Sequence, residues 1–496
     1  MSNYLSQIYV ALIGILLLPL YVKYMGTEAY GLVGFYSMLQ AWFSLLDMGL
    51  TPTIGRETAR YNGGAVSSLA YRQLYRALSV LFALIAVFGG GAIFLFSGPI
   101  ASKWLNVAEL SLDDVIITIQ IISIIVSLRW MSGLYKGVIT GFEKLVFLSA
   151  FNASFATFRF VFVFISMWFF GYTPIVFFVH QLIVAILEQT FLFSKTRELL
   201  PVKSLLKNNI GWSISPIKPV LKFSITIALT ASIWVFVTQT DKLILSGILS
   251  LADYGYFSLA VLVANGIVII SGPVSSAILP RLSKLHAENN RSEFLSVYRK
   301  STQLVSVVTG SVAVTLIISA RPLLIAWTGD IELAEKSAQI LRLYSAGNLF
   351  LSLSAFAYYL QYAKGNLKYH LIGNILLVVI LIPSVIHIAS LYGAIGAGYV
   401  WFFVNFFYFS LWVSYIHYKL EPNLFRKWLG KDILTILIPT LGMSLSMFFL
   451  INRFFGESED RLSNFIFVFV IALFSMFTAV FFSGKFRQVI KSKLFR

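Results

Sequence analysis

Cysteine does not occur in this 496-residue sequence, which excludes disulfide bonds, thiolate metal ligands and a cysteine nucleophile. Charged residues are also scarce. They make up 12% of the chain, about half of their share in a typical soluble domain. The sequence further lacks a Walker loop, a dinucleotide-binding fingerprint and a cluster of metal ligands. We therefore expect no metal, no cofactor and no enzymatic activity.

Hydrophobic residues take the place of the missing charges. They make up 58% of the chain, aromatic residues make up 16%, and the mean hydropathy is +0.83. Runs of about 20 apolar residues cross a bilayer as helices, and about fourteen such runs can be marked. They are 7–22, 30–50, 77–96, 115–133, 146–170, 175–193, 223–248, 254–279, 302–325, 337–361, 371–389, 393–415, 433–451 and 465–482. The predicted fold class is an all-α, polytopic membrane protein.

The 38 Lys and Arg residues outnumber the 21 Asp and Glu residues, which gives a formal net charge of +17. In a soluble chain this excess would suggest a nucleic-acid partner, which we do not expect here. Most basic residues, including Arg56, Arg60 and Lys136, fall in alternate loops between the apolar runs. Because basic loops mark the cytoplasmic side, both termini are predicted to be cytoplasmic. The opposite loops are short and tend to be acidic.

The longest polar interruption, 194–222, divides the apolar runs into two series. It contains three prolines and six basic residues, namely Lys195, Arg197, Lys203, Lys207, Lys218 and Lys222. The tripeptide Ala29-Tyr30-Gly31 recurs as Asp253-Tyr254-Gly255, at an offset of about 221–224 residues that indicates a duplicated unit. We predict an N-terminal lobe (1–193) and a C-terminal lobe (223–416), each of about six helices. A basic cytoplasmic linker (194–222) joins them, and 417–496 adds two helices and a basic tail.

A few charged residues fall inside the apolar runs, where each costs roughly 2.5–3.5 kcal/mol and needs a partner or a water-filled cavity. The basic ones are Arg129, Arg159, Lys242, Arg321 and Arg342, and the acidic ones are Asp47, Glu188 and Asp241. The excess of basic over acidic groups favours an anionic ligand. We expect the five basic residues to contact that ligand in a central cavity, and the three acids to pair or to act in gating and coupling.

Alternatives remain for the individual charges. Arg159 lies near the middle of its run, and it either contacts the anion or forms a structural pair with Asp47 or Glu188. Because neighbouring helical side chains point about 100° apart, Asp241 and Lys242 are not expected to pair with each other. Arg129 and Arg321 lie near the ends of their runs, where each could extend to the membrane interface. Arg342 is predicted about one turn inside its helix.

Two segments carry a family resemblance. Residues 4–61, YLSQIYVALIGILLLPLYVKYMGTEAYGLVGFYSMLQAWFSLLDMGLTPTIGRETARY, resemble the start of bacterial polysaccharide flippases of the O-antigen type, within the multidrug/oligosaccharidyl-lipid/polysaccharide export superfamily. Residues 238–260, TQTDKLILSGILSLADYGYFSLA, resemble the start of their second lobe. The resemblance implies a two-lobed transporter of the bacterial inner membrane with a V-shaped cavity and alternating access.

The same resemblance implies a substrate, an undecaprenyl-diphosphate-linked oligosaccharide that moves from the inner to the outer leaflet. It also implies contact with membrane lipids, and with a polymerase and a chain-length regulator of the same pathway. The first apolar run has no internal Arg and only Lys23 at its outer end, which weighs against a peptidoglycan precursor. Two alternatives remain: a cation-coupled drug antiporter of the same superfamily, and a membrane glycan polymerase. The polymerase would need a long outer loop.

Overall fold

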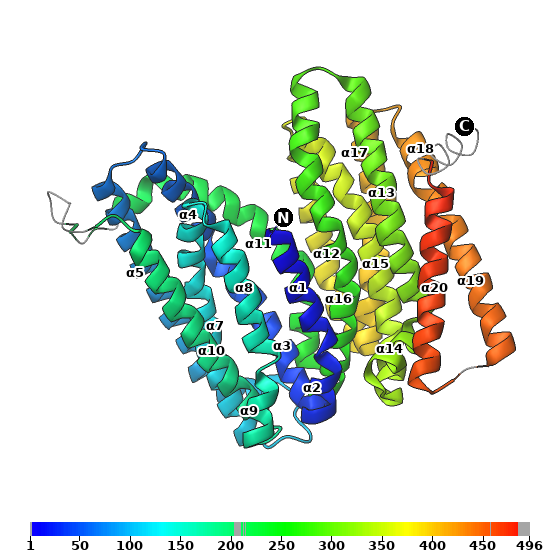
Figure 1. The fold of residues 1–496 in the computed structure, drawn as a ribbon, viewed down its shortest axis with the longest axis horizontal. Coiled ribbons are helices and arrows are strands. Elements are labelled where there is room, and N and C mark those ends of the chain that lie inside the picture. The colour runs from blue at the N-terminus through cyan, green and yellow to red at the C-terminus, as the bar shows by residue number, and fades with distance from the viewer. Residues whose placement is uncertain (1, 203–209, 212, 214, 457, 485–496) are drawn as a thin grey trace. The chain divides into compact units, whose positions relative to one another are not determined.

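The computed structural model describes residues 2–202, 210–211, 213, 215–456 and 458–484. Within these residues it is helical and has no strand beyond an isolated bridge between Asn106 and Ser250, which confirms the all-α class (Figure 1). The chain forms two compact units, Met1–Gly255 and Tyr256–Arg496. The predicted lobe boundaries at 193 and 223 rest on duplication and stay a prediction. Lys203, Lys207 and the basic tail from Lys485 onward lie outside the described residues.

The described residues of the first unit form ten main helices, most of them apolar. They are α1 (Ser2–Leu16), α2 (Leu18–Met25), α3 (Thr27–Phe43), α4 (Leu50–Asn62), α5 (Ser68–Leu95), α7 (Leu112–Gly141), α8 (Leu145–Phe160), α9 (Val163–Phe170), α10 (Pro174–Leu199) and α11 (Lys218–Ile248). The short elements η1 (Ser44–Asp47), α6 (Ser97–Pro99), η2 (Ile100–Trp104) and η4 (Ser215–Ile217) connect them.

The second unit continues α12 (Leu251–Ala287), which begins in the first. It contains α13 (Arg291–Ile318), α14 (Ala320–Thr328), α15 (Ile331–Ala363), α16 (Lys368–Phe407), η5 (Tyr408–Val413), α17 (Ser414–Leu420), α18 (Phe425–Lys427), η6 (Trp428–Leu434), α19 (Thr435–Phe455) and α20 (Arg461–Phe482). Side chains cap several starts: Asp330 accepts from the Leu333 amide, and Asp460 accepts from the Ser463 amide.

Ten helices in the described part of the chain are long and apolar enough to cross a membrane. The predicted number of fourteen stays a prediction, because some predicted segments do not match single helices. Segment 371–389 and most of segment 393–415 fall in α16, which bends at Gly393, where φ is 58°. Segment 7–22 is divided between α1 and α2.

Some predicted boundaries were wrong. Arg56 and Arg60 lie on helix α4 and not in a loop, and α7 extends to Gly141, so Lys136 is helical too. Helix α15 begins at Ile331, which places Arg342 about three turns inside it. Helices α7 and α15 extend beyond their apolar runs, and α4 begins where its run ends, because polar residues form helices as well as apolar ones do.

The repeated Tyr-Gly motifs make reciprocal contacts in the first unit. A side chain on Gly31 would overlap the carbonyl oxygen of Leu251, the first residue of α12. A side chain on Gly255 would overlap the carbonyl oxygen of Thr27, the first residue of α3. The two contacts are related by a constant offset of 224 residues. Two copies of one motif packed about a two-fold axis make reciprocal contacts of this form, and only glycine permits so close an approach.

The segment after η2 joins three helix ends of the first unit. The buried carboxylate of Glu28, at the start of α3, accepts hydrogen bonds from the amides of Ala108, Glu109 and Leu110 at 2.6, 2.6 and 2.8 Å. Asn106 donates its side-chain amide to carbonyls at the end of α11, and its own carbonyl accepts from Leu251 at 2.9 Å. These bonds satisfy helix-end groups that would otherwise lose hydrogen bonds in an apolar environment.

Glycine spacing positions α7, which carries two of the basic residues. Gly133, Gly137 and Gly141 recur every four residues and lie on one face. A side chain on Gly141 would overlap the carbonyl oxygen of Gly55 on α4, and one on Gly137 would meet Thr51. The backbones of α4 and α7 therefore approach closely, as small residues allow in membrane helices.

Ion pairs tie the connection between α17 and α19 to the rest of the second unit. Glu421 accepts from Arg291 and Lys364, each at 2.7 Å. Burial alone would raise the pKa of the Glu421 carboxyl, but hydrogen bonds from Lys364 and Arg291, and then their charges, bring it below its ordinary value. The fully buried Asp432 accepts from Arg299 at 2.6 Å and from Gln303 at 2.7 Å.

Glu28→Gln should destabilise the protein. Both oxygens of the Glu28 carboxylate accept hydrogen bonds from the three amides, whereas a glutamine side chain has only one acceptor oxygen. We expect a loss of about 2–4 kcal/mol, seen as a lower melting temperature in detergent. The control is Glu109→Gln, since the Glu109 side chain is exposed. Equal melting temperatures for both variants would contradict this role of Glu28.

Glu421 should make stability depend on pH. Its folded pKa is lowered, so its contribution is present above the pKa of the unfolded chain and is lost as pH falls through the folded pKa. The melting temperature of wild type should therefore exceed that of Glu421→Gln at pH 7. The gap should shrink below the ordinary glutamate value of about pH 4.3. A gap that is constant between pH 7 and 3.5 would contradict the expectation.

Candidate anion-binding site

Helices α7 and α10 form a ladder of polar contacts within the first unit. Arg129 and Lys136 are seven residues apart on α7, and Gln181 and Glu188 are seven residues apart on α10, so each pair lies on one helix face. Arg129 donates to Gln181 at 3.0 Å, and Lys136 donates to Glu188 at 2.9 Å. The two rungs lie about 10 Å apart along the helices.

Arg129 is held in place from two sides. Its guanidinium donates to the phenol of Tyr36 on α3 as well as to Gln181, and it lies 5.5 Å from the centre of the Tyr36 ring. Its buried Nε has no hydrogen-bond partner in the described part of the chain. Arg129 is therefore positioned by neutral groups, and no carboxylate that the structure describes lies within ion-pair distance of it.

Glu188 is the acid among these basic residues. Its side chain is 3% exposed, Lys136 occupies Oε1, and Oε2 is buried without a hydrogen-bond partner among the described atoms. The carboxylate interacts electrostatically with Lys136, Arg159 and Arg129. The basic cluster, which we define as Arg129, Lys136, Arg159 and Glu188, thus contains three positive charges and one negative charge.

Arg159 completes the basic cluster from the end of α8. The helix turns at Val161 and Phe162, which leaves the Arg159 carbonyl free to accept the Gln181 amide at 2.8 Å. Its Nε donates to the Phe155 carbonyl at 3.3 Å. Its two terminal nitrogens have no hydrogen-bond partner among the described residues. Arg159 also forms no direct ion pair with Asp47 or Glu188, so the predicted structural pairing is not observed.

Asp47 lies apart from the basic cluster, in η1. Its carboxylate accepts from the amide of Thr51, in the first turn of α4, at 3.1 Å and from the Thr51 hydroxyl at 2.5 Å. The structure thus places Asp47 against the first turn of α4, whose N-cap is Gly49. Its predicted part in gating or coupling stays a prediction.

The expectation that Asp241 and Lys242 do not pair was wrong. The Lys242 ammonium lies 3.1 Å from Oδ1 of Asp241 and also donates to the Thr238 carbonyl at 2.7 Å. The long lysine side chain bends back along α11 and reaches its neighbour, which the angle between the two Cβ directions does not prevent. Asp241 is buried, so the pair offsets a charge that would otherwise be costly.

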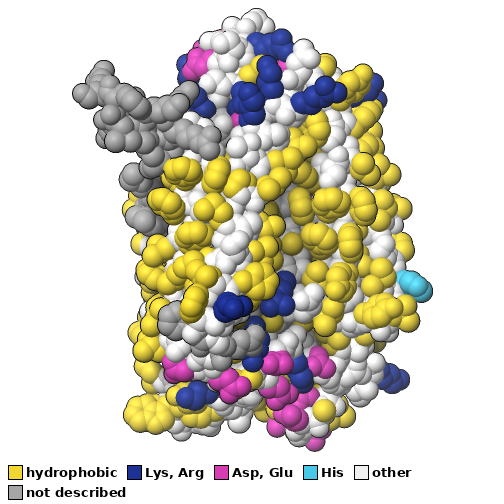
Figure 2. All heavy atoms as spheres, turned by 90° about the vertical axis from the view of Figure 1, so that its right-hand side faces the viewer, with side chains coloured by type: hydrophobic (Ala, Val, Ile, Leu, Met, Phe, Trp, Pro, Cys, Tyr) yellow, Lys and Arg dark blue, Asp and Glu magenta, His cyan; other side chains and the backbone are white. Residues whose placement is uncertain are grey.

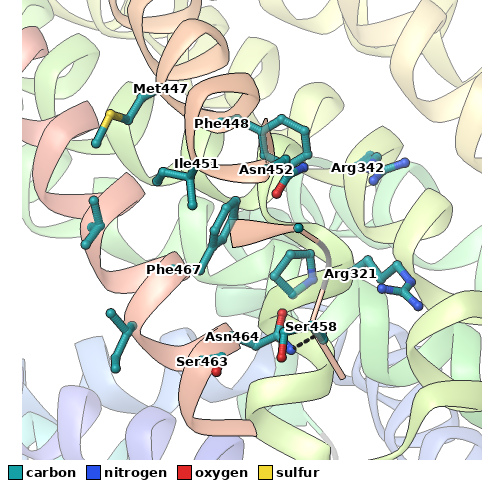
Figure 3. A pocket seen from close by; sticks show the side chains of 14 residues that line it. Arg321, Arg342, Met447, Phe448, Ile451, Asn452, Ser458, Ser463, Asn464 and Phe467 are labelled. Carbon is teal, nitrogen blue, oxygen red and sulfur yellow. Dashed lines mark hydrogen bonds between the residues drawn. The ribbon is translucent and has the colours of Figure 1, made fainter. Parts of the chain in front are cut away.

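The remaining two predicted residues lie together in the second unit. Arg321 on α14 and Arg342 on α15 line a cavity of about 580 Å³ whose other walls come from α19 and α20 (Figures 2 and 3). Arg321 pairs with Glu335 at 3.1 Å. Of the five predicted basic residues, Arg129 and Arg159 thus come together in the first unit and Arg321 and Arg342 in the second, whereas Lys242 pairs with Asp241 on α11.

Sequence reasoning missed three residues of the ladder. Lys136 was assigned to a loop, and Tyr36 and Gln181, which both bind Arg129, were not singled out. A signal was present: the seven-residue spacing of Arg129 with Lys136 and of Gln181 with Glu188 places each pair on one face.

Known proteins resemble the chain in sequence and in fold. A family model described as "Polysaccharide biosynthesis protein" matches residues 1–286, more than half of the chain. The comparison with curated protein sequences returned no match.

Three solved structures illustrate the likeness in fold. The lipid II flippase MurJ in an inward closed conformation has a TM-score of 0.72 at 16% identity, covering 100% of this chain and 99% of that chain. An inward-facing multidrug resistance MATE family transporter of the MOP superfamily has a TM-score of 0.63 at 12% identity, covering 84% and 96%. A MOP superfamily transporter from Pyrococcus furiosus has a TM-score of 0.54 at 13% identity, covering 84% and 94%.

At these identities the structural likeness establishes the fold, whereas the family model establishes kinship. The family model confirms the predicted kinship with polysaccharide proteins, and the solved structures confirm the fold that the predicted superfamily implies. The chain belongs to the polysaccharide biosynthesis protein family and has the polytopic helical fold of MOP superfamily transporters.

Proposed function

We propose that the protein is a flippase that moves an undecaprenyl-diphosphate-linked oligosaccharide from the inner to the outer leaflet of the bacterial inner membrane, with both termini in the cytoplasm. The observation that carries the proposal is the basic cluster, where three positive charges surround one carboxylate at the α7–α10 ladder. Kinship with the polysaccharide biosynthesis family and a fold like that of a lipid II flippase support it.

The basic cluster suits a diphosphate. The terminal nitrogens of Arg159 have no protein partner among the described residues, and a guanidinium binds two phosphate oxygens at once. Tyr36 and Gln181 hold Arg129 in position without neutralising it. In this proposal the diphosphate binds Arg159 and Arg129, and Glu188 serves as the internal counter-ion while the site is empty.

Charge also supplies a driving force. With an inside-negative potential, moving two negative charges outward across 100 mV releases about 4–5 kcal/mol. The Lys242–Asp241 pair and the two arginines of the second unit are proposed as further contacts along the path. Asp47, Glu188 and Asp241 are proposed to act in coupling or gating. A polymerase and a chain-length regulator would take over the translocated oligosaccharide.

A drug or cation antiporter is the alternative that the MATE-like fold suggests. Export of a cation requires an excess of acidic groups at the site, because a buried cation needs a negative partner. The basic cluster has the opposite sign, which favours the flippase. The chain is proposed to act as a transporter and not as an enzyme.

Arg159→Gln combined with Arg129→Gln should slow translocation about 10- to 100-fold, because charge-assisted hydrogen bonds to the diphosphate are lost. In cells whose surface polysaccharide depends on this protein, the lipid-linked oligosaccharide should accumulate in the inner leaflet. An impermeant reagent that oxidises sugar diols would measure the outer-leaflet fraction.

Arg56→Gln is the matched control, since that side chain lies at α4 outside the basic cluster and is 47% exposed. Arg159→Lys should retain part of the activity, because the positive charge remains. Normal outer-leaflet labelling in the double variant would contradict the proposal. Loss of resistance to cationic dyes, with normal labelling, would favour the antiporter.

A further inference from the structure

A cavity of about 580 Å³ lies at one end of the second unit. Its walls come from α14 and α15 on one side, and from the end of α19 and the start of α20 on the other (Figure 3). The volume is in the range of pockets that hold small ligands. Two chemically distinct walls face each other across it.

The first wall is apolar. Met447, Phe448 and Ile451 of α19 lie across from Phe467 of α20. Val470 of α20 also lines the cavity. The neighbouring side chains on these two helices, such as Phe449, Phe454 and Phe465, are 61–72% exposed. Since α19 and α20 are membrane-spanning helices, their exposed aromatic side chains face lipid. The apolar wall therefore suits the hydrocarbon chain of a molecule that enters from the bilayer.

The second wall is basic. Arg321 is paired with Glu335 at 3.1 Å, whereas the guanidinium of Arg342 reaches only the Gln339 amide, at 3.5 Å. No carboxylate that the structure describes lies within ion-pair distance of Arg342. The side-chain amide of Asn452, which also lines the cavity, has no hydrogen-bond partner among the described residues. Arg342 is therefore a positive charge of the cavity wall that no described carboxylate pairs.

The depth of Arg342 matches that of a lipid phosphate. The first turns of α15 carry Glu332, Glu335 and Lys336, which belong at the membrane surface. Arg342 lies six residues further on, about 9 Å along the helix, and its long side chain can extend back to the interface. Figure 2 shows basic side chains beside a hollow on this face and acidic side chains gathered at the adjoining end.

We propose that this cavity binds a membrane phospholipid with a monoanionic phosphodiester headgroup. The phosphodiester accepts hydrogen bonds from Arg342 and Asn452, and one acyl chain lies between α19 and α20. The positive charge of Arg342 matches one negative charge, whereas Glu332, Glu335 and the other acidic side chains at the adjoining end repel a diphosphate. The bound lipid joins the α19–α20 pair to α14 and α15. The site shares no residue with the basic cluster of the first unit.

Native mass spectrometry of the purified full-length protein tests the site with three probes: phosphatidylglycerol, phosphatidylethanolamine with the same acyl chains, and undecaprenyl diphosphate. Phosphatidylglycerol should bind about tenfold more tightly than phosphatidylethanolamine. Arg342→Gln should remove that preference by weakening phosphatidylglycerol about tenfold. Arg453→Gln, on α19 but outside the cavity, should leave it unchanged.

Val470→Trp provides a second test that leaves every charge in place, because the larger side chain fills the apolar wall. It should also weaken phosphatidylglycerol about tenfold, and Phe465→Trp on the exposed face should not. A melting curve for each variant identifies any that does not fold. If Arg342→Gln does not fold, the Val470→Trp variant tests the proposal in its place.

Equal binding of the two phospholipids, or equal binding by all variants, overturns the proposal. Displacement of phosphatidylglycerol by an equal or lower concentration of undecaprenyl diphosphate also overturns it, since the cavity would then be a substrate site. None of these readouts measures translocation, so failure here is distinguishable from failure of the proposed flippase function.

Discussion

The cost of placing charge in an apolar environment governs this structure. A charged side chain within the membrane needs a partner, a polar cavity or a route to the surface. The single carboxylate of Glu188 supplies the direct partner for Lys136 and the electrostatic partner for Arg129 and Arg159. One acid cannot neutralise three bases, so the basic cluster retains a positive surplus that only an external anion offsets. The proposed function follows from that surplus.

Backbone packing makes the basic cluster possible. Glycines at four-residue spacing allow α7 to lie close to α4, and the adjacent face of α7 presents Arg129 and Lys136 to α10. The early end of α8 frees the carbonyl of Arg159 for Gln181, which fixes the third basic residue beside the first. Neutral groups thus position the charges without cancelling them, as preorganised anion sites require.

The two units use charge in different ways. In the second unit, acids of the connection before α19 are each bound by bases: Glu421 by Arg291 and Lys364, and Asp432 by Arg299. These pairs hold elements together. The same unit leaves Arg342 without a carboxylate partner, beside an apolar cavity, within its described residues. A charge that the fold leaves unpaired is better evidence of a ligand than a charge that the fold has paired.

Composition and the length of the apolar runs determined the fold class, because a bilayer admits helices of about 20 residues and few other structures. The repeated Tyr-Gly tripeptides already indicated the duplication, and the reciprocal packing of Gly31 and Gly255 has the form that such a duplication predicts. The sequence also identified Arg129, Arg159 and Glu188 as unusual, since a charge in an apolar run is visible without coordinates.

Only the tertiary structure decided which charges meet. Hydropathy indicates that a charged side chain is costly in the membrane, but it does not indicate which helix packs against that side chain. The Lys136–Glu188 pair and the contact of Tyr36 with Arg129 were therefore missed. Lys242 and Asp241 pair because a flexible side chain bends along its own helix, which helical geometry at Cβ does not exclude. Helix packing also decides which basic residues come together. Some form the basic cluster at α7 and α10, and others line the cavity at α15 and α19. Packing arises from contacts between residues far apart in the chain, and no local pattern encodes it.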